Sequence, residues 1–268
     1  MSLRLASAAV VIPILALLIW AGPPLFSLVM AALAGVGAWE VCRLARNRDR
    51  RPVAPVAITW SIAFVALGHV LAEDWSPRDT SRAMVAIVAT AYVFWQARRA
   101  RGRVGLANWR ITAGAARYPG GLLAFAPLLR GLDQGTEWVF LLVLVTFATD
   151  TSAFLVGRLA GKTPLAPSIS PGKTREGAVG GLVGAVIASV ALASIMGLAT
   201  SVLSALLLGL LMGVAGQLGD LAESRIKRWA EAKDSGKLIP GHGGVLDRLD
   251  SIVFNLVLVY YFVIWAVQ

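Results

Sequence analysis

The sequence predicts an all-α integral membrane protein, and three observations support this fold class. Of the 268 residues, 57% are hydrophobic and only 15% are charged, whereas soluble domains carry about 25% charged residues. The mean hydropathy is +0.71. Apolar stretches recur from one end of the chain to the other, and most are near the ~20 helical residues that cross a bilayer.

About nine transmembrane helices are expected from these stretches. They are residues 5–21, 24–42, 53–72, 81–97, 111–129, 137–157, 178–199, 201–220 and 251–267. The first stretch resembles a signal peptide, but its length and the closeness of the second stretch favour an uncleaved helix. The fifth contains Arg117, Tyr118 and Pro119, so we expect it to start late or to be broken. The single cysteine, Cys42, is expected to be a packing residue.

Basic residues in the connecting segments predict the orientation. The chain has 25 Lys and Arg residues, and most of them lie near the N-terminus or in alternate loops. The exceptions are Arg78, Arg82, Arg117 and Arg130. Because positively charged loops stay in the cytoplasm, we expect a cytoplasmic N-terminus and a multi-pass protein of the plasma (inner) membrane. Topology and anionic lipid account for the net charge of +10, so no nucleic-acid partner is expected.

The densest group of charges lies in residues 220–251, between two apolar stretches. Asp220 and Glu223 are three residues apart and share a helix face, and Lys227 joins that face. Carboxylates that can gather a divalent metal, beside cations that can hold phosphates, indicate phosphoryl-group chemistry at a bilayer surface.

The same segment continues through a glycine-rich part, residues 241–244. Glycines allow a backbone to approach a ligand closely. A helix is expected to resume near Val245, which would place Asp247 and Asp250 on one face with Arg248 beside them. Two helix ends would then present two carboxylate pairs to one cytoplasmic pocket, and Mg²⁺ favours one or two carboxylates plus phosphate oxygens and water.

A second constellation runs from Asp150 to residue 177. An ionisable residue at membrane depth, such as Asp150, is a functional candidate by default. The polar segment after it offers Ser170, Lys173 and Thr174 as donors for phosphate oxygens. Its Gly-Lys-Thr resembles a nucleotide-binding phosphate loop, but residues 163–172 show neither the upstream glycine nor a strand that this motif needs. A nucleoside triphosphatase of the soluble type is therefore not expected.

With these residues in view, the chain resembles the phosphatidate cytidylyltransferase (CDP-diacylglycerol synthase) family. The family signature is matched by Ser224, Ile226, Lys227, Arg228, Lys233, Asp234, Gly236, Ile239, Pro240, His242, Gly243, Gly244, Val245, Asp247, Arg248, Leu249 and Asp250. An upstream pattern is matched by Ser170, Pro171, Lys173, Thr174, Glu176 and Gly177. The chain departs from the family at Ser152 and Phe154, where glycine and tyrosine are common.

The resemblance implies that CTP and phosphatidate react to CDP-diacylglycerol and pyrophosphate with Mg²⁺, and that the protein is a homodimer. Two metal ions are an open alternative. The expected catalytic residues are Asp150, Asp220, Lys227, Asp247 and Asp250. The expected metal ligands are Asp220 and Asp247, with Glu223 and Asp250 as further candidates. The expected substrate-binding residues are Ser170, Lys173, Thr174, Ser224, Arg228, His242 and Arg248.

A single polytopic membrane domain is expected for residues 1–268, with a mainly helical scaffold in 1–149 and the catalytic motifs in 150–251. Three alternatives stay open from the residues themselves. The lipid acceptor could be another lipid phosphate, such as an isoprenoid-ether lipid, or the protein could be a polyprenol kinase. A transporter is the third, although it predicts charges near the bilayer midplane and repeat-related broken helices, and here the charges gather at cytoplasmic helix ends.

Overall fold

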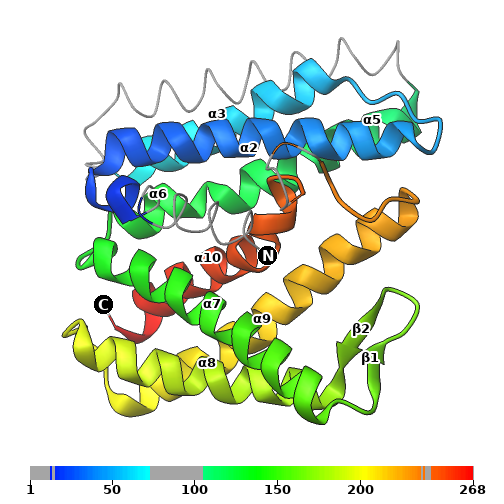
Figure 1. Ribbon diagram of the computed structural model, residues 1–268. Coiled ribbons are helices and arrows are strands. Elements are labelled where there is room, and N and C mark those ends of the chain that lie inside the picture. The colour runs from blue at the N-terminus through cyan, green and yellow to red at the C-terminus, as the bar shows by residue number, and fades with distance from the viewer. Residues whose placement is uncertain (1–12, 14–15, 73–104, 237, 239–242, 268) are drawn as a thin grey trace. The chain divides into compact units, whose positions relative to one another are not determined.

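The computed structural model describes residues 13, 16–72, 105–236, 238 and 243–267 of the 268. The chain divides into two compact units. Unit 1 comprises residues 1–133 and 229–247, and unit 2 comprises residues 134–228 and 248–268. Figure 1 follows the chain through both units by colour. The expectation of one domain stays a prediction.

Six helices of the described residues are long and apolar enough to cross a membrane, judged by length and composition. They are α2 (Pro23–Arg46), α3 (Ala54–Ala72), α7 (Gly135–Ala160), α8 (Arg175–Ile195), α9 (Val202–Trp229) and α10 (Leu246–Ala266). They coincide with six predicted stretches, so the prediction of a helical, multi-pass membrane protein is confirmed. Most of the stretch 5–21 and all of 81–97 lie outside the described residues, and the number nine stays a prediction.

The fifth predicted stretch is broken, as its proline suggested. It begins as α5 (Leu106–Ala116), continues as a π-helical turn η1 (Arg117–Gly121) and ends as α6 (Phe125–Arg130). Pro119 lies inside η1, and a proline has no N–H to donate to the preceding turn, which interrupts the α-helical ladder.

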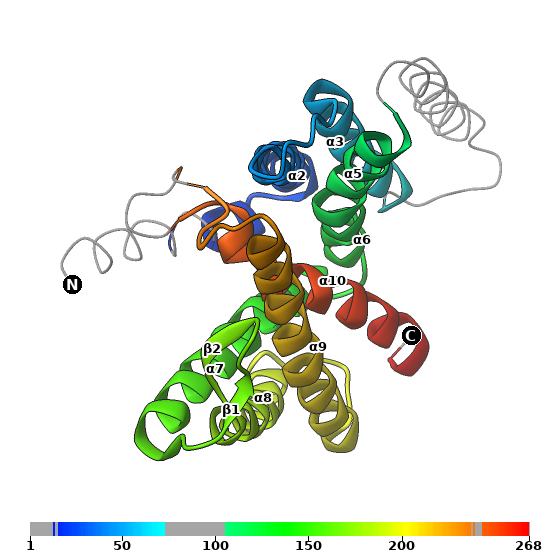
Figure 2. The same ribbon diagram turned by 90° about the vertical axis from the view of Figure 1, so that its right-hand side faces the viewer.

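In unit 1, α3 packs against α2 on one side and against α5 and α6 on the other (Figure 2). The Ser61 hydroxyl on α3 donates to the carbonyl of Ala34 on α2 at 2.9 Å. Backbone contact is close here, because a Cβ on Gly120 would lie 2.5 Å from Ser61 Cα. Cys42 is buried in an alanine-rich cluster, which confirms it as a packing residue.

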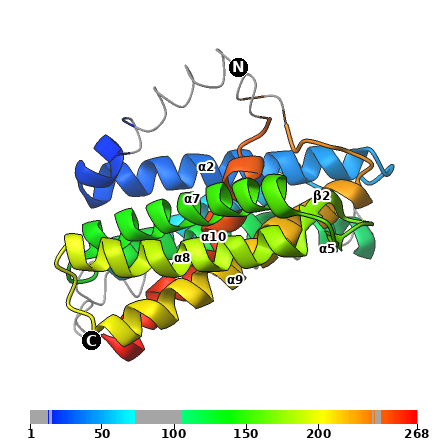
Figure 3. The same ribbon diagram turned by 60° about the horizontal axis from the view of Figure 1, so that its bottom comes forward.

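In unit 2, α7 and α8 lie side by side along their lengths (Figure 3). A two-stranded antiparallel hairpin connects them, formed by β1 (Pro164–Ala166) and β2 (Ser170–Thr174). The sequence-based expectation that residues 163–172 contain no strand was therefore wrong. The hairpin is not a phosphate-loop fold, because its two strands are antiparallel and form a sheet by themselves.

Small residues let α8 approach α7 and α9 closely. A Cβ on Gly180 would lie 2.5 Å from Val156 Cβ on α7, and one on Gly209 would lie 2.8 Å from the carbonyl oxygen of Ala185. At Gly184 it would lie 2.1 Å from Ser152 Oγ. The absence of a side chain at Gly184 provides the space for the Ser152 hydroxyl at this crossing.

We expect Gly184→Ala to destabilise unit 2 by about 1–3 kcal/mol, the usual cost of overpacking. The nearest obstacle is the Ser152 side chain, so adding Ser152→Gly should restore most of the loss. Thermal unfolding of the detergent-solubilised protein measures both variants. Gly114→Ala is the matched control, because a Cβ there meets nothing within 4 Å. Equal behaviour of Gly184→Ala and Gly114→Ala would contradict the close approach.

Candidate functional site

Unit 2 contains a pocket of about 350 Å³ at the end of α7 next to the hairpin. Its volume is within the range of small-molecule sites. The polar and charged side chains that line it come from α7, β2 and α9: Asp150, Arg158, Lys173, Thr174, Gln217 and Asp220. Glycines 157, 172 and 177 complete much of the remaining wall. The pocket therefore joins the two constellations that the sequence singled out.

The β2–α8 junction, which forms one wall, is fixed by local hydrogen bonds. Thr174 is the N-cap of α8, and its hydroxyl oxygen accepts from the Gly177 N–H at 3.1 Å. Threonine is a favoured cap because this bond satisfies an N–H that the helix leaves without a partner. The Glu176 carboxylate accepts from the backbone N–H groups of Lys162 and Thr163. These bonds tie the base of the hairpin to the start of α8.

An ion pair crosses the pocket from β2 to α9. Lys173 Nζ lies 2.6 Å from Asp220 Oδ2, and the two side chains are 27% and 30% exposed. Asp220 also accepts a hydrogen bond from the Ser224 hydroxyl, one turn later on α9, at 3.3 Å. Lys173 is thus held inside the pocket with its ammonium group still accessible.

Three carboxylates of unit 2 are close enough for their charges to interact: Asp150, Asp220 and Asp250. They come from α7, α9 and α10. Gly219 permits the approach of α10, because a Cβ there would lie 2.5 Å from the backbone oxygen of Asp250. The positive charges of Lys173 and Arg248 attract the negative charge of Asp150. Three helices of unit 2 therefore each contribute one carboxylate to the same region.

The end of α9 carries the next predicted residues. Glu223 is almost fully buried and forms an ion pair of 3.0 Å with Lys227. Arg228 donates from Nε to the carbonyl of Ile169 in the hairpin turn at 3.1 Å.

The length of α9 explains how these residues stay helical. A helix of 28 residues is about 42 Å long, which exceeds the ~30 Å hydrocarbon core. The polar last turns can therefore remain helical beyond the lipid.

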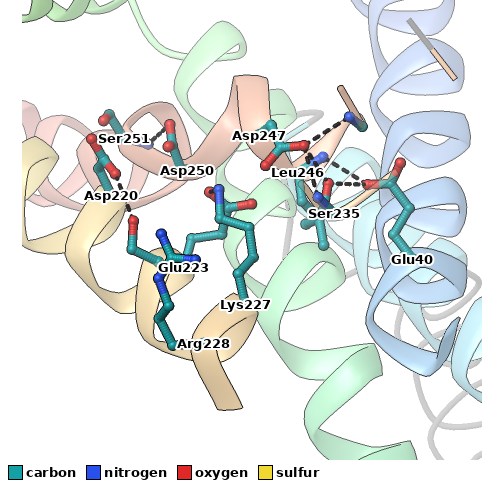
Figure 4. A network of polar contacts seen from close by, with 12 residues as sticks. Glu40, Asp220, Glu223, Lys227, Arg228, Ser235, Leu246, Asp247, Asp250 and Ser251 are labelled. Carbon is teal, nitrogen blue, oxygen red and sulfur yellow. Dashed lines mark hydrogen bonds and ion pairs between the residues drawn. The ribbon is translucent and has the colours of Figure 1, made fainter. Parts of the chain in front are cut away.

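Asp247 is held by a separate set of contacts, which lies in unit 1 (Figure 4). Its Oδ2 accepts from the Ser235 N–H at 2.9 Å, from the Ser235 hydroxyl at 2.9 Å and from the Gly244 N–H at 2.8 Å. Asp247 and Asp250 are three residues apart on α10, as the sequence predicted. One carboxylate oxygen of Asp247 is thus committed to holding the backbone before α10.

The pocket brings together four of the predicted site residues, which are Asp150, Lys173, Thr174 and Asp220. Five others lie in unit 2 outside its wall: Ser170, Glu223, Ser224, Lys227 and Arg228. Asp250 and Arg248 interact with Asp150 through their charges. His242 lies outside the described residues. The roles assigned to all of these residues stay predictions.

Two residues were missed by the sequence analysis. Gln217 lines the pocket and donates from Nε2 to the carbonyl of Ala178 at 3.1 Å; its spacing of three from Asp220 could have indicated it. Glu40 is fully buried in α2 and bonds to Ser235. An acid inside an apolar stretch was the signal that could have found it.

Among the described residues, no three His, Cys, Asp or Glu side chains are grouped so that they could hold a metal ion by themselves. This finding is compatible with Mg²⁺, which usually takes one or two carboxylates and completes its shell with substrate phosphate and water. Asp220 fits such a role best, because it faces the pocket and is close to two other acids.

Comparison with known proteins identifies relatives that share one name. Phosphatidate cytidylyltransferase of Bacillus subtilis (strain 168) is 39% identical over 148 residues, 55% of this chain and 55% of the relative. Phosphatidate cytidylyltransferase of Staphylococcus saprophyticus is 40% identical over 134 residues, 50% of this chain and 52% of the relative. Phosphatidate cytidylyltransferase 4, chloroplastic, of Arabidopsis thaliana is 40% identical over 211 residues, 76% of this chain and 51% of the relative.

The chain spans about half the length of these curated relatives. A family model matches much more of the chain. The model described as "Cytidylyltransferase family" covers residues 2–266, which include every residue of the pocket. The chain therefore belongs to the cytidylyltransferase family.

Proposed function

We propose that the protein transfers the cytidylyl group of CTP to phosphatidate, giving CDP-diacylglycerol and pyrophosphate for phospholipid synthesis. The observation that carries this proposal is the pocket of unit 2. There Lys173 and Thr174, from the upstream motif, lie with Asp220, which is four residues before the start of the family signature at Ser224. Family membership and the names of the relatives support the same reaction.

The phosphates of CTP would bind at the hairpin side of the pocket. Lys173 is an accessible ammonium group that can exchange part of its interaction with Asp220 for a phosphate oxygen. The Thr174 oxygen accepts from Gly177, so its own O–H is directed elsewhere and can donate to a phosphate. Both groups are fixed before the substrate arrives, and such preorganisation is the main source of electrostatic catalysis.

Mg²⁺ would be held by Asp220, with Asp250 and Asp150 as its nearest acidic neighbours. The mutual repulsion of these carboxylates favours a divalent cation among them. The ion would neutralise charge on the phosphates during transfer. Asp247, the other predicted metal ligand, and Glu223, a further candidate, each already have hydrogen-bond or ion-pair partners, and their metal-binding roles stay predictions.

The reaction needs positioning more than covalent chemistry. An oxygen of the lipid phosphate attacks the α-phosphorus of CTP, the new P–O bond forms, and the bond to the β-phosphate breaks to release pyrophosphate. Because both reactants are anionic, alignment and charge neutralisation are what the protein must supply. No side-chain nucleophile takes part, so no covalent intermediate is expected.

The proposed location is the plasma (inner) membrane, with the N-terminus and the pocket on the cytoplasmic side, where CTP is available. The basic loops support this orientation. Phosphatidate would reach the pocket from the lipid, with its acyl chains still in the bilayer. We also propose a homodimer, on the family resemblance alone, and light scattering of the detergent-solubilised protein would test it.

An isotope experiment tests the reaction against its alternatives. Purified protein in detergent is given Mg²⁺, phosphatidate and CTP labelled either at the α- or at the γ-phosphorus, and label in the extracted lipid is counted. We expect α-label in the lipid, γ-label in pyrophosphate, and neither product after chelation of Mg²⁺. Parallel reactions contain an isoprenoid-ether lipid phosphate or a polyprenol instead of phosphatidate.

Each alternative gives a distinct outcome in this experiment. Transfer of γ-label to the polyprenol would identify a kinase and contradict the proposal. Transfer of α-label to the isoprenoid-ether lipid phosphate but not to phosphatidate would contradict the proposed acceptor. Absence of any transfer, with protein that is monodisperse, would contradict the enzymatic function.

A further inference from the structure

Glu40 is a fully buried carboxylate that the proposed reaction does not use. It lies in the membrane-spanning helix α2 and has 0% exposure. A buried acid is costly unless its oxygens accept several hydrogen bonds, and acids inside apolar helices generally have a function. What surrounds its oxygens therefore indicates what the residue does.

The carboxylate of Glu40 accepts hydrogen bonds from two chain segments that are distant in sequence (Figure 4). The Ser235 hydroxyl lies 3.0 Å from Oε2. The N–H groups of Val245 and Leu246 lie 3.0 Å from Oε1 and 2.9 Å from Oε2. The latter two groups are at the start of α10, where a helix leaves its N–H groups without internal partners. Glu40 thus caps α10 from another helix, where a negative charge is favourable.

Ser235 links Glu40 to Asp247. Its hydroxyl lies within hydrogen-bonding distance of both carboxylates, at 3.0 Å and 2.9 Å. A hydroxyl has one proton to donate, so this proton is shared between the two acids. Any change at Glu40 will therefore alter how firmly Asp247 is held.

Two glycines provide independent evidence for the same arrangement. A Cβ on Gly236 would lie 2.3 Å from Glu40 Oε1, and one on Gly244 would lie 2.4 Å from the same oxygen. Both positions belong to the motif that resembles the family signature. At Gly236 the Glu40 carboxylate is the nearest obstacle to a side chain, whereas at Gly244 the Ser235 hydroxyl is nearer still, at 2.1 Å. Both backbones are therefore packed against the group formed by Glu40 and Ser235.

We propose that Glu40 is a positioning residue for the catalytic motif. It fixes residues 235–236 and 244–246 on one carboxylate and, through Ser235, sets the position of Asp247 on the first turn of α10. It does not contact the substrates. This inference rests on the proposed function for its effect on turnover, whereas its effect on the folded protein is independent of that function.

The first test compares Glu40→Gln with wild-type protein in the cytidylyl-transfer assay. The amide keeps the shape of the side chain but turns an N–H donor toward groups that are themselves donors. We expect kcat to fall by about 10–100-fold, the usual effect of changing a residue that supports a ligand. KM for CTP should change by less than about threefold, because the pocket of unit 2 does not contain Glu40. A matched control is Glu231→Gln, an exposed acid paired with Arg48, whose loss should cost little.

An unchanged kcat in Glu40→Gln would overturn the proposal. A rise in KM for CTP with kcat retained would also overturn it, because Glu40 would then act on nucleotide binding. A variant that is only less stable would start at the wild-type rate and lose activity during incubation. A positioning defect would instead lower the initial rate per folded molecule, and a time course of product formation distinguishes the two.

The second test needs no activity, so it separates failure of this inference from failure of the proposed function. Gly236→Ala alone should lower the unfolding temperature, because its methyl group would overlap the Glu40 carboxylate. In a Glu40→Ala background the same substitution should cost little, because the obstacle is gone. Additive losses in the double variant would show that Glu40 does not impose the glycine, and would overturn the inference.

Discussion

Replacing Asp220 by asparagine is expected to reduce cytidylyl transfer by about 10²–10³-fold, the range seen when one preorganised electrostatic contact is removed. Asp220 lines the pocket, pairs with Lys173 at 2.6 Å and interacts with the charges of Asp150 and Asp250. The amide keeps the size of the side chain but cannot balance a divalent cation. Initial rates over a range of Mg²⁺ concentrations measure the effect, and raised Mg²⁺ should restore part of the activity.

A matched control for this variant is Asp49→Asn, which removes one negative charge from an exposed position of unit 1. Asp49 has φ of 52°, and asparagine tolerates that conformation well, so its activity should equal that of wild type. If Asp220→Asn kept near-normal turnover at every Mg²⁺ concentration, the assignment of Asp220 to the metal would be wrong.

Replacing Lys173 by methionine should weaken CTP binding by about 10–100-fold, which corresponds to the ~1.5–3 kcal/mol of a hydrogen bond to a charged group. The substitution keeps most of the apolar stem and removes the ammonium group from the pocket wall. The effect should appear mainly in KM for CTP, with a smaller fall in kcat. Lys173→Arg should keep part of the affinity, because it retains the charge with a different shape.

Lys162→Met is the matched control for Lys173. Lys162 is an exposed lysine beside the same hairpin, and its backbone N–H, not its side chain, donates to Glu176. Its replacement should leave KM for CTP unchanged. Equal effects of the two substitutions would indicate a general attraction of CTP to a basic surface, and the specific role of Lys173 would be rejected.

The membrane helices were predictable because hydrophobic length is a local property. The eighth stretch was predicted to end at 220, whereas α9 continues to Trp229. Apolar composition marks only the part of a helix in lipid, and the polar turns that carry Asp220 and Glu223 continue the same helix beyond it. The break at Pro119 was equally local, since one missing N–H causes it.

Features that depend on distant residues were not predictable. The β1–β2 hairpin has strands of three and five residues that contain proline and glycine, and such short strands lack an alternating pattern. Glu40 and Ser235 are 195 residues apart in the chain. Nothing near Glu40 in the sequence indicates that its partners are the backbone groups at the start of α10.

The pairing of Lys173 with Asp220 was only partly predictable. Each residue was singled out from its own motif, but their contact at 2.6 Å depends on how the hairpin folds back over α7 and α8 toward α9. Sequence motifs therefore identified the chemical groups, and the fold of unit 2 determined which of them line one pocket.

The most direct test of the central claim is to locate the CTP phosphates on the protein. CTP carrying an aryl azide on its γ-phosphate is photocrosslinked to the wild-type protein with Mg²⁺, and labelled peptides are identified by mass spectrometry with and without excess CTP. We predict CTP-competed labelling within residues 150–178 or 217–228, the segments that form and adjoin the pocket. Competed labelling confined to residues outside these segments would contradict the account.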